Sequence, residues 1–141
     1  MPTTADDLAH LTLLGHGAGA QPNRQLETFP NHNPDRRYTI TLATDEFTCV
    51  CPATGQPDYA TITIQYIPDE RIVESKSLKL YLWSYRNEGV FQEHLINTIC
   101  DDLITALDPH WIEVTGAFKA RGGLTLTVVV NHDKSAQPLH A

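Results

Sequence analysis

The stretch Ala60-Thr61-Ile62-Thr63-Ile64-Gln65-Tyr66-Ile67 alternates between apolar and polar side chains along most of its length. Successive side chains of a β-strand lie on opposite faces, and β-branched residues favour strands, so this stretch predicts a strand with one buried face. Residues 38–42 alternate in the same way and come shortly before it. The two segments therefore predict an antiparallel pair.

A second pair of alternating segments closes the chain, at residues 111–118 and 124–130. Arg121-Gly122-Gly123 lies between them and is typical of a turn, so we expect a second β-hairpin. Between the two hairpins, apolar residues recur at helical spacing up to Asp108-Pro109, which predicts a helix that ends there. These apolar residues are Phe91, Leu95, Ile96, Ile99, Leu103, Ile104 and Leu107. Residues 73–85 fit either a strand or one face of a helix.

Length and charge limit the class of protein. The chain has 141 residues, of which 41% are apolar, and this suffices for one domain but not for two ordinary ones. We expect a flexible leader over residues 1–37, rich in Pro, Gly and Asn, and a folded domain over residues 38–141.

The net charge of -7 disfavours direct nucleic-acid binding. No apolar run suits a membrane span and no secretory signal is present, so we expect a cytoplasmic protein.

Two motifs that could bind a metal or a nucleotide are incomplete. Cys49-Val50-Cys51 offers two thiolates, but a structural zinc site needs four ligands and the seven histidines show no paired spacing, so we expect no metal. Gly15-His16-Gly17-Ala18-Gly19-Ala20 fits the dinucleotide fingerprint, but Gln21-Pro22-Asn23 follows it where a helix would have to begin. We therefore do not expect a Rossmann site.

The segment Cys51-Pro52-Ala53-Thr54-Gly55-Gln56-Pro57-Asp58 is more informative. Its prolines and glycine favour a stiff, tightly turned loop that can bring Cys51 and Asp58 together. A thiol that faces a carboxylic acid is a nucleophile with a proton donor. The alternative is a structural cysteine and a turn-capping aspartate, which residue types alone would favour. Cys49 and Cys100 are interpreted as structural.

A third motif is Val73-Glu74-Ser75-Lys76-Ser77-Leu78-Lys79. It can be interpreted as a solvated segment. Alternatively, Lys76 and Lys79, one helical turn apart, could hold a phosphate-bearing ligand while Glu74 and Ser75 form hydrogen bonds to a second ligand.

The last two motifs, together with Phe91-Gln92-Glu93 and Arg121-Gly122-Gly123, closely resemble the short form of the NADPH-dependent 7-cyano-7-deazaguanine reductase family of queuosine biosynthesis. The resemblance covers about residues 38–131. It implies the α+β tunnelling fold, in which a β-hairpin, two antiparallel helices and a second β-hairpin follow one another, and it therefore makes residues 73–85 a helix. It also implies a homo-oligomer whose subunits join their sheets into a β-barrel, with active sites at subunit interfaces.

The resemblance also implies roles for single residues. Cys51 attacks the nitrile of 7-cyano-7-deazaguanine to form a covalent thioimide, Asp58 supplies protons, and NADPH delivers hydride twice to give the primary amine 7-aminomethyl-7-deazaguanine. The substrate-binding residues implied are Val73, Glu74, Ser75, Gln92 and Glu93. The cofactor-phosphate contacts implied are Lys76, Lys79 and Arg121.

One position departs from the family pattern. Gln92 stands where the family usually carries a histidine before the helix glutamate. An amide can form hydrogen bonds to a ligand but cannot shuttle a proton as imidazole does, so an acid–base role at this position is in doubt. His94, two residues further on, points to a different side of a helix and is not an obvious replacement.

Two other classes compete with this interpretation. A pterin or purine hydrolase on the same fold, such as a GTP cyclohydrolase, would need metal-binding Cys and His at suitable positions. A catalytically silent binding protein would be expected to lose Cys51 or Asp58, and both are present. The motifs therefore favour the reductase.

Overall fold

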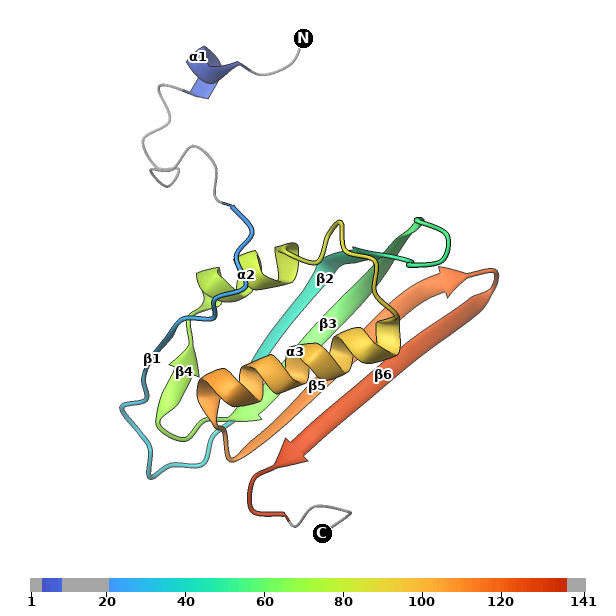
Figure 1. The fold of residues 1–141 in the computed structure, drawn as a ribbon. Helices are drawn as coiled ribbons and strands as arrows, with labels where there is room; N and C mark the ends of the chain where they lie inside the picture. The colour runs from blue at the N-terminus through green and yellow to red at the C-terminus, as the bar shows by residue number, and fades with distance from the viewer. Residues whose placement is uncertain (1–3, 9–20, 137–141) are drawn as a thin grey trace.

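Two helices lie on one face of a four-stranded antiparallel sheet in the computed structural model, which describes residues 4–8 and 21–136 (Figure 1). The strand order is β2-β3-β5-β6, so the two hairpins meet where β3 pairs with β5. This arrangement confirms the α+β class with an antiparallel sheet and two helices. The elements are α1 (Ala5–Leu8), β1 (Thr28–Pro30), β2 (Ile40–Val50), β3 (Pro57–Ile67), β4 (Arg71–Val73), α2 (Ser75–Trp83), α3 (Gln92–Leu107), β5 (Trp111–Arg121) and β6 (Leu124–Asp133).

Both predicted hairpins are confirmed, and both are longer than the alternating segments. In β2 and β3, Thr44 pairs with Ile62, but the next paired residue of β2 is Phe47, opposite Ala60. One extra residue in β2 forms a β-bulge there. Because the bulge shifts the alternation, Phe47 and Cys49 face the helices and are buried. The strand then continues to Val50 and delivers the Cys51 loop at its end.

The predicted helix over residues 91–107 is confirmed as α3. Its buried side chains are Leu95, Ile96, Ile99, Cys100, Leu103 and Leu107. Gly116 of β5 lies beneath this helix, and a Cβ atom at that position would be only 2.4 Å from Cδ1 of Ile96. The missing side chain therefore lets the helix pack closely on the sheet. Asp108 ends the helix in the left-handed conformation, with φ of 43°.

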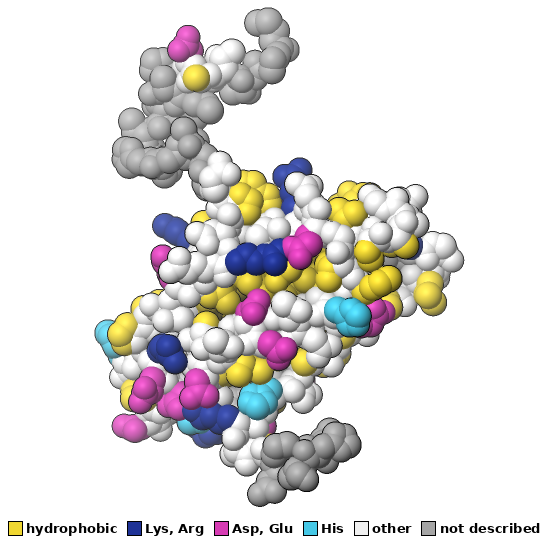
Figure 2. Space-filling view, viewed as in Figure 1, with side chains coloured by type: hydrophobic (Ala, Val, Ile, Leu, Met, Phe, Trp, Pro, Cys, Tyr) yellow, Lys and Arg dark blue, Asp and Glu magenta, His cyan; other side chains and the backbone are white. Residues whose placement is uncertain are grey.

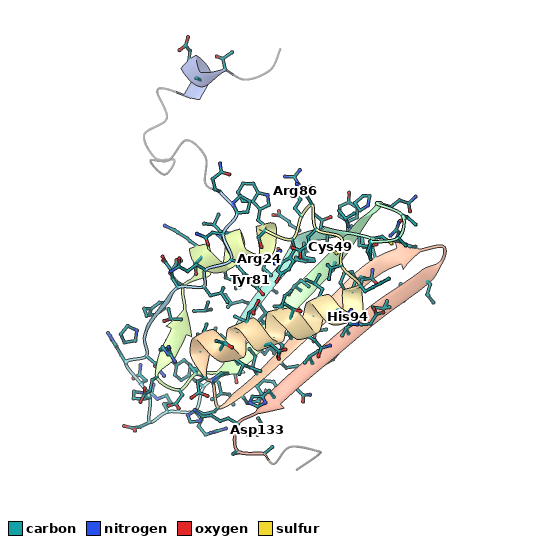
Figure 3. The ribbon with its side chains drawn as sticks, in the orientation of Figure 1. Arg24, Cys49, Tyr81, Arg86, His94 and Asp133 are labelled. Carbon is teal, nitrogen blue, oxygen red and sulfur yellow. The ribbon has the colours of Figure 1, made fainter. Side chains whose placement is uncertain are left out.

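Residues 75–83 form a helix, as the resemblance implied. Glu74 caps it: its carboxylate accepts hydrogen bonds from the backbone N–H groups of Lys76 at 3.0 Å and Ser77 at 2.7 Å. These hydrogen bonds hold the pKa of Glu74 below its usual value. The Tyr81 hydroxyl of α2 (labelled in Figure 3) donates to Asp102 of α3 at 2.5 Å, which ties the two helices together.

Residues 23–31, which fall within the expected leader, contact the folded domain. Strand β1 pairs with β4, and the backbone N–H of Glu27 donates to the hydroxyl of Ser77 at 3.0 Å. The backbone N–H of Asn31 donates to the carbonyl of Glu70 at 2.8 Å. A strand of three residues shows no detectable alternation, and its partner is distant in the sequence. The glycine motif at residues 15–20 lies outside the described residues.

In the part of the chain that the structure describes, no helix is both long enough and apolar enough to cross a membrane. Figure 2 shows the face that carries the helices, where acidic, basic and histidine side chains are interspersed around a seam of hydrophobic ones.

Candidate active site

A cavity of about 390 Å³ lies where the Cys51 loop, the start of α3 and the tip of the second hairpin meet. Five of the predicted site residues line this cavity, although they come from distant parts of the chain. They are Cys51, Asp58, Gln92, Glu93 and Arg121. Its apolar lining comes from Pro52, Val90, Phe91, Leu124 and Leu126. The cavity thus combines a thiol, two carboxyl groups and a guanidinium with apolar walls suited to a small ring.

The Cys51 loop is held by its own backbone. The N–H of Cys51 donates to the carbonyl of Gln56 at 2.8 Å, and the N–H of Gly55 donates to the carbonyl of Cys51 at 2.9 Å. Gly55 has a φ of 73°, a conformation that most side chains disfavour. These contacts give the stiff connection that the sequence predicted between the end of β2 and Asp58.

The loop also activates its thiol. The pKa of the half-buried Cys51 is lowered, first by a hydrogen bond from the Thr54 hydroxyl and then by the backbone N–H groups of Thr54 and Ala53. The positive charge of Arg121 adds to this effect. A thiol with a lowered pKa is more often present as the thiolate, which is the nucleophilic form.

The other two cysteines have the opposite character. Burial, together with the nearby charge of Asp58, raises the pKa of Cys49 to about 11. Burial likewise raises the pKa of Cys100 to about 11. Figure 3 labels Cys49, which lies on β2 beneath the segment that connects the helices. Among the three thiols, Cys51 is therefore the one suited to attack a substrate.

Asp58 is buried, with only 5% of the residue exposed. Nη1 of Arg121 donates to its Oδ1 at 2.5 Å, so the carboxylate forms an ion pair at the wall of the cavity. The hydroxyl of Thr48 donates to the backbone carbonyl of Asp58 at 2.8 Å and helps to fix the start of β3. A second nitrogen of Arg121, Nη2, donates to the side-chain oxygen of Gln56.

The segment between the two helices braces the loop from the other side. The N–H of Val50 donates to the carbonyl of Glu88 at 3.0 Å, and the N–H of Val90 donates to the carbonyl of Val50 at 3.1 Å. A Cβ atom on Gly89 would lie 3.3 Å from Cα of Pro52, so the two backbones approach closely. This contact places the start of α3, with its Gln92 and Glu93, beside the Cys51 loop.

The remaining predicted residues do not reach this cavity within one chain. Glu74 caps α2, and Val73 is buried at the end of β4. Ser75 and Lys79 line a separate cavity of about 230 Å³. Lys79 also lines a groove of about 720 Å³ between α2 and the edge strand β2, where Trp83 and Arg86 are found as well. The predicted site is therefore divided into two sets of residues.

Three residues at or near the cavity, Thr54, Gln56 and Lys119, were not singled out from the sequence. Thr54 and Gln56 belong to the quoted motif, so their signal was present, but their contacts with Cys51 and Arg121 depend on the loop conformation. Lys119 lines the cavity from β5, and the residues next to it in the sequence form no motif that indicates a place in the site. His94, considered from its sequence position as a replacement for the family histidine, is not among the residues that line the cavity. It lies near the start of α3 (Figure 3), where its ring meets that of Phe91 edge-on with centroids 6.2 Å apart.

No group of three or more His, Cys, Asp or Glu side chains in residues 4–8 and 21–136 is arranged to hold a metal ion. The charged and nucleophilic side chains described above are thus the reactive groups that the described chain itself contributes to the cavity.

Comparison with known proteins gives a consistent result. The model of the QueF-like protein family matches residues 57–137. The NADPH-dependent 7-cyano-7-deazaguanine reductase of Syntrophus aciditrophicus (strain SB) is 58% identical over 132 residues, which cover 94% of this chain and 93% of that protein. The protein of the same name from Anaeromyxobacter sp. (strain K) is 60% identical over 112 residues, which cover 79% of this chain and 92% of the relative.

A solved structure shares the fold. The apo crystal structure of the archaeosine synthase QueF-Like superposes with a TM-score of 0.62 at 24% identity and covers 66% of this chain and 91% of its own. Because curated relatives match nearly the whole length at more than half identity, this chain belongs to the family of NADPH-dependent 7-cyano-7-deazaguanine reductases.

Proposed function

We propose that this chain reduces the nitrile of 7-cyano-7-deazaguanine to the primary amine 7-aminomethyl-7-deazaguanine with NADPH, as a cytoplasmic step of queuosine biosynthesis. The observation that supports this most directly is the cavity in which the Cys51 thiol, with its lowered pKa, and the buried Asp58 meet. The 58% identity to a reductase of that name supports the choice of substrate and cofactor.

The first step is the addition of the thiol across the nitrile. The sulfur of Cys51 bonds to the nitrile carbon, the triple bond becomes a double bond, and the thiol proton moves to the nitrogen by way of the Asp58 carboxylate. Nothing leaves, so the product is a thioimide that contains the whole substrate. A thioimide accepts hydride more readily than a free nitrile does, which is the advantage of covalent catalysis here.

Two hydride transfers complete the reduction. The first NADPH delivers hydride to the thioimide carbon and a proton goes to nitrogen. The carbon–sulfur bond then breaks, which releases Cys51 and leaves an imine. The second NADPH delivers hydride to the imine carbon, and a further proton gives the amine. The four electrons of nitrile reduction thus come from two NADPH molecules.

Recognition of the heterocycle is assigned to the start of α3. Glu93 lies in the first turn of that helix and at the cavity wall. Its carboxylate can accept two hydrogen bonds from the N–H edge of a guanine-like ring. Gln92 beside it can also form hydrogen bonds to the substrate, but its amide does not titrate, so protons are assigned to Asp58.

The second set of residues is assigned to the same site through a neighbouring subunit. Edge strands β2 and β6 each leave one side of the sheet unpaired within the chain, and pairing between subunits would close a barrel. In such a homo-oligomer, Val73, Glu74 and Ser75 of one subunit would complete the cavity of the next. Lys76 and Lys79 are the proposed cofactor-phosphate contacts in an otherwise acidic protein. Arg121, which the resemblance adds to them, is already paired with Asp58.

The test is a turnover assay with protein, NADPH and 7-cyano-7-deazaguanine, in which the nicotinamide absorbance is followed and the product is identified by mass. We expect two NADPH molecules to be consumed for each amine formed. No consumption of NADPH by the purified oligomer would contradict the proposed function.

A further inference from the structure

Arg121 reaches the cavity from the last residue of β5. The pairing of β5 with β6 shifts between Phe118 and Arg121, so the strand is irregular just before this residue. Its side chain crosses to the first hairpin, where Nη1 donates to Oδ1 of Asp58 at 2.5 Å and Nη2 donates to the side-chain oxygen of Gln56. One guanidinium thus joins two residues of the Cys51 loop region to the second hairpin.

Both acceptors of the Arg121 hydrogen bonds, Asp58 and Gln56, have a part in the proposed reaction. Asp58 is the proposed carrier of the thiol proton. Gln56 positions the nucleophile, because its backbone carbonyl accepts the N–H of Cys51 at 2.8 Å. The planar guanidinium presents separate N–H donors to the carboxylate and the amide oxygen in a fixed geometry, which the flexible lysine ammonium does not provide.

The guanidinium of Arg121 is already engaged by these two hydrogen bonds. Its side chain is two-thirds covered, with 33% exposed, and its ion-pair partner Asp58 has a side chain that is 6% exposed. If a cofactor phosphate bound Arg121 and broke this ion pair, the buried Asp58 carboxylate would lose its charge partner, at a cost in free energy. These contacts are formed without any cofactor, so they can act while the thiol attacks the nitrile.

We propose that Arg121 is a positioning residue for thioimide formation: by holding Asp58 and Gln56 together, it aligns the proton carrier with the Cys51 thiol. This inference rests on the proposed function and changes the role that the family resemblance implies for Arg121. It predicts that substitution of Arg121 slows the formation of the Cys51 adduct in the absence of NADPH.

The experiment measures the rate at which full-length oligomeric protein gains the mass of 7-cyano-7-deazaguanine in the absence of NADPH. Arg121→Gln should form the adduct at least about tenfold more slowly than the wild type, the size expected for a displaced proton-transfer group. Arg121→Lys keeps the charge but not the fork and should recover only part of that rate. Arg36→Gln, a cation loss at an exposed residue that lines none of the cavities described above, is the matched control and should leave the adduct rate within about twofold.

A double variant separates positioning from general loss of structure. If Arg121 acts through Asp58, adding Arg121→Gln to Asp58→Asn should slow adduct formation by less than about twofold beyond Asp58→Asn alone. Gln56→Leu, a change at an exposed loop residue, should slow the adduct step in the same direction and serves if Arg121→Gln does not fold.

The inference would be overturned if Arg121→Gln formed the adduct at a rate within about fivefold of the wild type, or if the losses in the double variant were additive. If Arg121→Gln does not fold and Gln56→Leu is measured instead, a wild-type adduct rate for Gln56→Leu would overturn it. A wild-type protein that forms no adduct would instead overturn the proposed function, so the two failures are distinguishable.

Discussion

The two regions that the sequence singled out differ in how complete they are within one chain. Around Cys51, the loop, the start of α3 and the ends of β5 and β6 surround one cavity, and two of its charged groups, Asp58 and Arg121, are already paired. Around the start of α2, the carboxylate of Glu74 is engaged by its own helix, and Lys79 lines other hollows.

This difference separates two tasks. The groups proposed to make and break bonds are brought together by the folding of a single subunit, because the loop, the strand and the helix are linked by backbone hydrogen bonds. The groups assigned to the substrate and the cofactor phosphates at α2 await a second subunit in the proposed function. We therefore expect that a substitution near Cys51 can impair bond making and breaking without affecting the proposed contacts at α2, and that a substitution at α2 can do the reverse.

The largest effect should come from Cys51. Cys51→Ala should lower turnover by about three orders of magnitude or more and abolish the mass adduct, since no other described thiol has a lowered pKa. Cys49→Ala and Cys100→Ala are matched controls and should keep both adduct and turnover. Peptide mass spectrometry that finds the adduct on Cys49 would refute the assignment of the nucleophile.

Asp58 should give the next largest effect. Asp58→Asn keeps the size of the side chain and removes the proton carrier, so kcat should fall by about 10²- to 10⁴-fold. Substrate binding, measured by calorimetry on the Cys51→Ala background, should change much less. A variant that weakens binding but turns over normally at saturating substrate would show that Asp58 acts in recognition and would remove the distinction drawn between the two regions.

A mixing experiment tests whether the α2 region serves a neighbouring subunit. Cys51→Ala and Glu74→Gln oligomers, each of low activity, are dissociated, mixed in equal amounts and reassembled. If the two residues of one site come from different subunits, about one quarter of the sites in the mixed oligomers regain both groups. Reassembled mixtures no more active than the parents would place both residues in the same subunit's site. Reassembled wild-type protein is the control for recovery.

The smallest effect concerns the thiol itself. The Thr54 hydroxyl is the largest cause of the lowered pKa of Cys51, so Thr54→Val should raise that pKa toward the ordinary value of a cysteine. The pH profile of alkylation by iodoacetamide would show the shift, and Thr48→Val, whose hydroxyl binds the Asp58 carbonyl, is a nearby control. An unchanged profile for Thr54→Val would mean that another group stabilises the thiolate.

Sequence reasoning succeeded where structure depends on near neighbours. Both hairpins and α3 were predicted because alternation and helical spacing report which face of an element is buried. It left residues 73–85 open, because the apolar spacing of that segment fits two periods. The pairing of β1 with β4 was missed because each strand has three residues.

Cys51 and Asp58 lie in one short motif, in a loop that is closed by its own backbone. Residue types alone favoured a structural role for both, and the resemblance of the motif to a known family made them the proposed nucleophile and proton carrier. The sequence by itself thus determined the two hairpins, α3 and the turn chemistry of the Cys51 loop, all of which depend on local residue patterns. Only the tertiary structure decided that Arg121, 63 positions from Asp58, completes the loop, and that the residues at the start of α2 lie elsewhere. Contacts between hairpins depend on how sheets and helices pack, and no local period in a sequence encodes that.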